Sequence, residues 1–209
     1  MKGSLLIVGA FAVGCIVGRM GWLPSWLLGG ALSLWVLYAL MLQVGIGIGS
    51  DARLKEIFRN ITPRTVLVPC ATIVGTIVAS FLVSFALVRW SAADVVAVGC
   101  GFGYYSLSSI LVSSLKEAHI GLQAAAELGT ITLMANVFRE LMTLLFAPAM
   151  VRWFSPLGPI CAGGATTIDV TLPVITRVSG RDWLFVSILH GVVVDFSVPL
   201  LVPFFCSLG

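Results

Sequence analysis

The sequence predicts an all-α membrane protein: a polytopic bundle of transmembrane helices that forms one domain over residues 1–209. Of the 209 residues, 59% are hydrophobic, and the mean hydropathy is +1.08. Charged residues make up 10%, whereas a soluble domain carries about 25% to cover its surface. The 12 basic and 9 acidic side chains are too few to coat a soluble globule. They suffice for loops and interior sites in a protein whose outside faces lipid.

Apolar stretches follow one another along the chain, which is long enough for six or seven spans of ~20 residues. The fourth and sixth stretches are interrupted near 99–109 and 161–173 by glycine and polar residues, so we expect them to be broken or re-entrant. The seven segments lie approximately at 4–23, 26–49, 65–88, 94–114, 120–150, 159–175 and 183–206.

Basic residues in the loops predict the orientation. The polar loop at 50–64 should face the cytoplasm together with the N-terminus, since such loops carry the excess of Lys and Arg. If every segment crosses, Lys116 also lies inside, and Arg89 and Arg152 lie outside. The basic residues of the loop are Arg53, Lys55, Arg59 and Arg64.

The fifth segment carries polar residues in the middle of a predicted span. Thr132, Asn136, Glu140 and Thr143 recur at helical spacing and share one stripe, with Arg139 at its edge. A charged residue at mid-membrane costs about 2.5–3.5 kcal/mol, so it usually faces a cavity or a partner. We interpret Glu140 as a carboxylate that binds a cation or proton, with Asn136 and the threonines as further ligands, and we include Arg139 among the binding residues. The alternative is a structural pair between Arg139 and Glu140, or a pair to another helix.

The sixth segment combines paired glycines, threonines, an aspartate and a proline, which suit a lipid-facing helix poorly. A helix broken inside protein exposes carbonyls and half-helix ends, with which transporters build sites. We therefore interpret Asp169, Thr166 and Thr167 as site residues; the alternative is a close-packed seam of small residues. The polar and helix-breaking residues are Gly163, Gly164, Thr166, Thr167, Asp169, Thr171 and Pro173.

The fourth segment offers a second interruption, in which glycines precede Tyr104, Tyr105 and Ser106. Aromatic faces can stack on an ammonium group; the alternative is a packing surface with interfacial tyrosines. In the seventh segment, His190 is either a hydrogen-bonded structural residue or a proton relay. Asp195, five positions on, points about 140° away around the helix and needs another partner.

No pattern points to an enzyme, a cofactor or a metal. The five cysteines are at least 30 residues apart, and no nucleophile elbow, phosphate loop or metal-ligand spacing occurs. A net charge of +3 is too small and dispersed for nucleic acid.

Four blocks in order resemble the bacterial lysine exporter (LysO-type) family. The resemblance implies export of L-lysine and related cationic amino acids across the inner (cytoplasmic) membrane in exchange for protons, with Glu140 and Asp169 as functional carboxylates. Asn136 stands where the family often has an aspartate. The blocks are Gly101-Phe-Gly103-Tyr-Tyr105-Ser-Leu-Ser108, Arg139-Glu140-Leu, Gly164-Ala-Thr166-Thr-Ile-Asp169-Val-Thr171-Leu-Pro173 and His190-Gly191.

Two other functions fit the same residues: a transporter subunit for sodium or another cation, and a structural membrane subunit that transports nothing. Single-chain relatives carry a further N-terminal membrane module, so we expect a small membrane partner or a second copy to complete this chain. Association should use the helix faces of Gly14-x-x-x-Gly18 and Gly45-x-x-x-Gly49.

Overall fold

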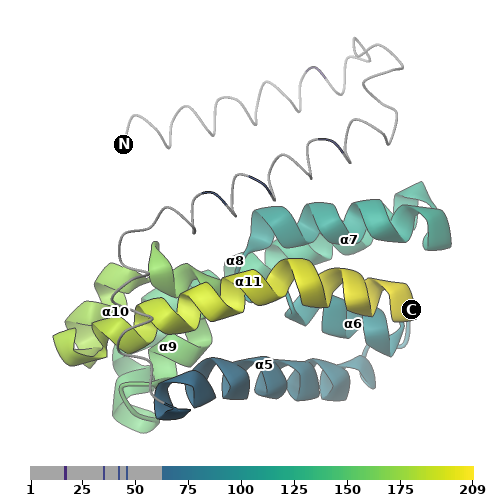
Figure 1. The fold of residues 1–209 in the computed structure, drawn as a ribbon. Helices are drawn as coiled ribbons and strands as arrows, with labels where there is room; N and C mark the ends of the chain where they lie inside the picture. The colour runs from purple at the N-terminus through teal and green to yellow at the C-terminus, as the bar shows by residue number, and fades with distance from the viewer. Residues whose placement is uncertain (1–16, 18–34, 36–41, 43–45, 47–62) are drawn as a thin grey trace. The chain divides into compact units, whose positions relative to one another are not determined.

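The computed structural model describes residues 63–209 and the single residues 17, 35, 42 and 46. The chain divides into two compact units, Met1–Tyr38 and Ala39–Gly209, and every element below belongs to the second. Residues 63–209 form α-helices and short 3-10 helices, with no strand among them (Figure 1). The all-α prediction is confirmed for these residues. The predicted first two segments and both association faces lie outside the described residues.

Three described helices are long and apolar enough to cross a membrane. They correspond to the predicted third, fifth and seventh segments, and an α-helix suits this role because it satisfies its own backbone in lipid. The count of seven spans is not confirmed, because the fourth and sixth segments fold as pairs of short helices. The long helices are α5 (Pro63–Ser84), α8 (Leu122–Trp153) and α11 (Leu184–Leu208).

The three long helices run between the same two ends of this unit. Glu127, near the start of α8, pairs with Arg89 beyond the end of α5, so these helices are antiparallel. Near their middles, α5 and α11 meet where His190 Nε2 lies 2.9 Å from Thr72 Oγ1. Figure 1 shows that these two run in the same direction. We name the ends the Pro63 end and the Ser84 end.

Between the long helices lies a first hairpin, formed by α6 (Ala92–Gly99) and α7 (Tyr105–Ile120). Ser91 begins it with a capping box: its hydroxyl accepts from the Asp94 N–H, and the Asp94 carboxylate accepts from the Ser91 N–H. Lys116 Nζ, late in α7, lies 2.8 Å from Asp94 Oδ1. The hairpin therefore enters from the Ser84 end and returns to it, and the predicted break near 99–109 is confirmed.

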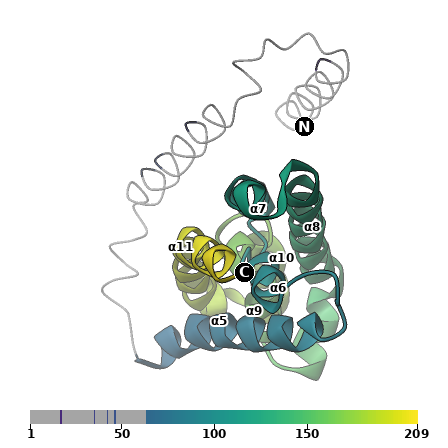
Figure 2. The same cartoon turned by 90° about the vertical axis from the view of Figure 1, so that its right-hand side faces the viewer.

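A second hairpin enters from the Pro63 end. It consists of α9 (Gly158–Gly163), the 3-10 helix η1 (Gly164–Ile168) and α10 (Leu172–Ser179), which confirms the predicted break near 161–173. The Ser179 hydroxyl donates to the Pro156 carbonyl at 2.9 Å, which joins the two feet of the hairpin. The 3-10 helix η2 (Arg181–Trp183) then leads into α11. Figure 2 looks nearly along α11, with α5 running across the view, and shows α6 and α9 between the long helices.

These hairpins correct the predicted placement of two basic residues. Lys116, expected in a cytoplasmic loop, is fully buried and paired with a buried Asp94. Arg152 lies in the last turn of α8 at the Pro63 end, where α5 begins, and not at the opposite end. The reason is the same in both cases: the fourth segment returns instead of crossing, so Lys116 lies inside the fold and the fifth segment crosses in the direction opposite to the predicted one.

We expect Lys116→Met to destabilise the folded protein by about 3–5 kcal/mol, because it leaves the Asp94 carboxylate buried without its partner. Thermal unfolding in detergent measures the loss. The double variant Lys116→Met with Asp94→Asn should recover much of it, and Glu117→Gln, at an exposed position of the same helix, should unfold like the wild type. Equal stability of Lys116→Met and wild type would contradict a stabilising role of the Lys116–Asp94 ion pair.

Candidate functional site

The tips of the two hairpins meet inside the unit. The Ala165 N–H donates to the Phe102 carbonyl at 2.9 Å. Gly103 and Gly164 have φ of +91° and +63°, a left-handed conformation that favours glycine. A Cβ atom on Gly164 would collide with the Phe102 carbonyl. Glycine at this position is therefore what lets the two tips touch.

Helix α8 holds both tips through two polar side chains. Asn136 accepts from the Gly103 N–H at 2.7 Å and donates to the Val98 carbonyl at 3.2 Å, which fixes the first tip. Arg139 donates from Nε to the Ala162 carbonyl at 2.8 Å. Its Nη2 donates to the Cys161 carbonyl at 3.1 Å, and its guanidinium lies 5.5 Å from the Phe102 ring centre.

Arg139 thus satisfies carbonyls at the end of α9 and contacts the first tip as well. It forms no ion pair with Glu140, so the pair considered from the sequence is not formed in the described part of the chain. Both Asn136 and Arg139, which the sequence places among the binding residues, have their polar atoms engaged by backbone groups. Their geometry is that of residues that position the tips.

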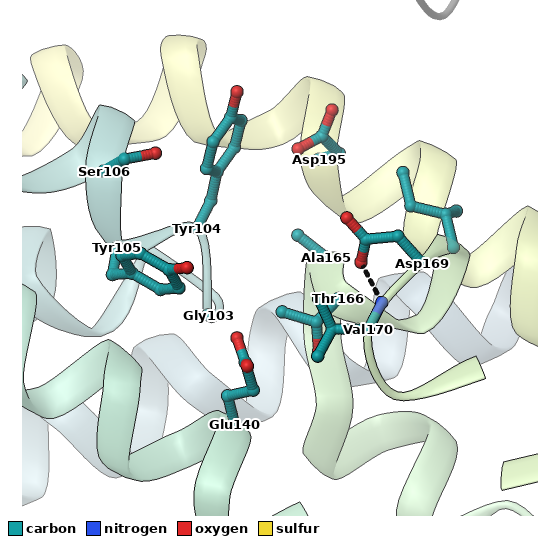
Figure 3. A pocket seen from close by; sticks show the side chains of 11 residues that line it. Gly103, Tyr104, Tyr105, Ser106, Glu140, Ala165, Thr166, Asp169, Val170 and Asp195 are labelled. Atoms are coloured by element: carbon teal, nitrogen blue, oxygen red, sulfur yellow. Dashed lines mark hydrogen bonds between the residues drawn. The ribbon is translucent and has the colours of Figure 1, made fainter. Parts of the chain in front are cut away.

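A pocket of about 380 Å³ lies beside the meeting point of the tips, and Figure 3 shows the side chains that surround it. Of the ten predicted site residues, six line this pocket: Tyr104, Tyr105, Ser106, Glu140, Thr166 and Asp169. The remaining lining residues are Gly103, Ala165, Ile168, Val170 and Asp195.

Three carboxylates from three elements face the pocket: Glu140 from α8, Asp169 from the turn after η1, and Asp195 from α11. Figure 3 shows Asp169 and Asp195 on one side and Glu140 across from them. Asp169 accepts from the Val170 N–H. One buried carboxylate oxygen of Glu140 has no hydrogen-bond partner. In the described part of the chain, no three acidic, histidine or cysteine side chains are grouped closely enough to share a metal ion.

No lysine, arginine or histidine is among the residues that line the pocket. Two cations of the described chain have other partners: Arg139 binds the Cys161 and Ala162 carbonyls, and Lys116 pairs with Asp94. No cationic side chain among the described residues forms an ion pair with the three pocket carboxylates. Such a site attracts cations and protons.

His190 and Thr167 lie outside the pocket lining. The Thr167 hydroxyl donates to the Ser187 carbonyl at 3.0 Å and lies 3.4 Å from His190 Nδ1, while His190 Nε2 contacts Thr72. Both side chains are fully buried. His190 therefore joins α11 to α5 and to the second hairpin, which agrees with the structural interpretation of a lone histidine.

Sequence reasoning left Asp195 out of the site. The signal was present, because a carboxylate in an apolar helix is itself a candidate for a functional residue. The periodicity within α11 separated Asp195 from His190, but it could not show that the Asp195 face meets Asp169.

Comparison with known proteins decides the family. The profile of the family described as "Lysine exporter LysO" matches residues 8–206. The chain belongs to the lysine exporter LysO family. It is 30% identical over 207 residues to "Lysine exporter LysO" of Escherichia coli (strain K12), covering 98% of this chain and 64% of that protein. It is 29% identical over 193 residues to a "Putative lysine exporter" of Haemophilus influenzae (strain Rd), covering 90% and 92%. No solved structure matches.

Family membership and the apolar helices make this a membrane protein of a transporter family. The match includes α5, both hairpins, α8 and nearly all of α11, so the elements that build the pocket lie inside the family region. The chain spans 64% of the length of the E. coli exporter.

We expect Gly164→Ala to disrupt the site, because the added methyl collides with the Phe102 carbonyl and alanine is strained at positive φ by ~1–2 kcal/mol. Gly180→Ala is the matched control: its φ is +96°, but no atom lies within 4 Å of the added methyl. The unfolding temperature and the rate of lysine efflux should both fall further in Gly164→Ala than in Gly180→Ala. Equal losses in the two variants would show that the contact between the tips is dispensable.

Proposed function

We propose that this chain exports L-lysine and related cationic amino acids across the inner membrane in exchange for protons. The observation that carries the proposal is the pocket at the hairpin tips, which presents three carboxylates and no basic side chain. The names of the two relatives support lysine as the substrate.

The pocket offers what a buried ammonium group needs. Removing a cation from water is costly unless anions and dipoles replace the water. Glu140, Asp169 and Asp195 supply the anions, and the Tyr104 and Tyr105 rings lie beside them (Figure 3). The unpartnered oxygen of Glu140 is a free acceptor for an N–H group of the substrate.

Coupling to protons follows from the same carboxylates. A protonated carboxyl group must release its proton before it can pair with an ammonium group, so the two cations compete for one site. A transporter that exposes this site to one side at a time would then exchange them. Glu140 suits this role best, since Asp169 already accepts a backbone hydrogen bond.

The charges of the described residues support a cytoplasmic Pro63 end. Arginines gather there, whereas Arg89 lies at the Ser84 end and Lys116 is buried. This distribution follows the excess of basic residues on the cytoplasmic side of membrane proteins. In this orientation, the first hairpin enters from the periplasmic side and the second from the cytoplasm. The arginines are Arg64, Arg152, Arg177 and Arg181.

We predict that a cysteine at Phe154 is shielded from a membrane-impermeant maleimide in intact cells, and that one at Gln123 reacts. The two exposed positions mark opposite ends of α8, and the five native cysteines are first replaced by alanine. Disrupted cells serve as the control in which both should react. Labelling of Phe154→Cys and not of Gln123→Cys in intact cells would reverse the orientation.

We predict that Glu140→Gln and Asp169→Asn each abolish lysine efflux while the protein still reaches the membrane. Each substitution keeps the shape and removes one negative charge from the pocket. Loss of a carboxylate that pairs with the desolvated ammonium group of the substrate costs about 2–5 kcal/mol, or more than tenfold in transport at limiting substrate. Efflux of radiolabelled lysine from preloaded cells measures the effect, with Glu117→Gln as the control. Normal efflux by both pocket variants would refute the site.

We further propose that a small membrane subunit or a second copy of the chain completes the transporter. Mass measurement after purification in mild detergent, followed by reconstitution, tests this proposal. A monomer that transports by itself would refute it.

A further inference from the structure

The charges around the pocket do not match those of lysine. Lysine carries two ammonium groups and one carboxylate. Two cationic ends fit the two anionic sides of the pocket, with Asp169 and Asp195 on one side and Glu140 across from them (Figure 3). No side chain among the lining residues carries a positive charge for the carboxylate.

Neither of the two neighbouring positive groups supplies a partner for the carboxylate of lysine. The Arg139 guanidinium donates to the Ala162 and Cys161 carbonyls and lies against the Phe102 ring. Helix α7 begins at Tyr105, which lines the pocket, and its N-terminus presents backbone N–H groups. A helix N-terminus is equivalent to about half a positive charge, which is small beside three carboxylates.

We infer that the pocket also accepts linear diamines, molecules with an ammonium group at each end and no carboxylate, and that the chain exports them. This inference rests on the proposed function, because it assigns the same pocket to the same transport process. A diamine keeps both attractive contacts and removes the group that three carboxylates repel. A pocket of about 380 Å³ lies in the size range of small-molecule sites.

The experiment is counterflow into proteoliposomes that contain the full chain and are preloaded with unlabelled substrate. Entry of radiolabelled 1,5-diaminopentane is compared with that of labelled lysine. Lysinamide, which lacks the carboxylate, and norleucine, which lacks the terminal ammonium group, are tested as competitors. We expect diaminopentane to exchange at concentrations no higher than lysine requires. Lysinamide should compete at least as well as lysine, and norleucine should not compete.

Two variants connect the result to the pocket. Asp195→Asn should lower diaminopentane exchange by about tenfold or more, since it removes one of the two carboxylate charges on that side of the pocket. Glu117→Gln, which removes an exposed carboxylate outside the pocket, should leave the exchange unchanged.

Each outcome decides between the two proposals. If lysine exchanges and diaminopentane neither exchanges nor competes at about tenfold higher concentration, the diamine inference is wrong and lysine export stands. Exchange of diaminopentane without lysine would support the inference and refute the proposed substrate. If neither compound exchanges in a preparation that has a normal unfolding transition and retains any membrane subunit that copurifies with the chain, both proposals are wrong. Equal exchange by Asp195→Asn and wild type would also contradict the diamine site.

Discussion

The contact between the two hairpin tips is the constraint on which the site depends. It consists of one hydrogen bond, from the Ala165 N–H to the Phe102 carbonyl, at a point where Gly164 leaves no room for a side chain. Interrupted backbone at this depth must be satisfied by protein, because lipid offers no hydrogen bonds. Asn136 and Arg139 provide the hydrogen-bond partners that the two tips do not provide for each other. One face of α8 thereby holds both tips, and Glu140 follows directly after Arg139.

The charged side chains of the described chain differ in whether they have a partner. Within the described chain, Lys116 is paired with Asp94 and Arg139 is engaged by carbonyls, while the pocket carboxylates have no cationic partner. Asp195 is buried and Glu140 half-buried, while Asp169 is exposed. An ionisable group buried without a partner is costly, and natural interiors keep such groups mainly where a ligand or proton completes them. The closed Lys116–Asp94 ion pair indicates a structural role, and the carboxylates without a cationic partner beside the tips support the proposed binding role.

Much of this arrangement could be predicted from the sequence. The long apolar helices and both interruptions follow from hydropathy and glycine content, and Glu140 and Asp169 were identified because ionisable residues are rare in such segments. Hydropathy left open whether the fourth segment crosses as a broken helix or returns, since a hairpin and a span of that length are equally apolar. The evidence lies in the pairing of Lys116 with Asp94, which is a tertiary contact. Helical periodicity likewise shows which residues of α11 share a face, but not which element packs against that face. Asp195 could therefore not be placed in the site from the sequence.

The hydrogen bonds from Asn136 and Arg139 to the hairpin tips explain why the sequence pattern suggested a binding role for both residues. A polar stripe on an apolar helix shows that something polar lies opposite, but it does not distinguish a substrate from an exposed backbone. Here the backbone of two broken segments lies opposite, and it occupies Asn136 and Arg139, while Glu140 faces the pocket. Any movement of α8 against either tip would break these bonds and shift Glu140 relative to Asp169 and Asp195. The geometry that positions the tips is therefore also the geometry that sets the distance between the two anionic sides of the pocket.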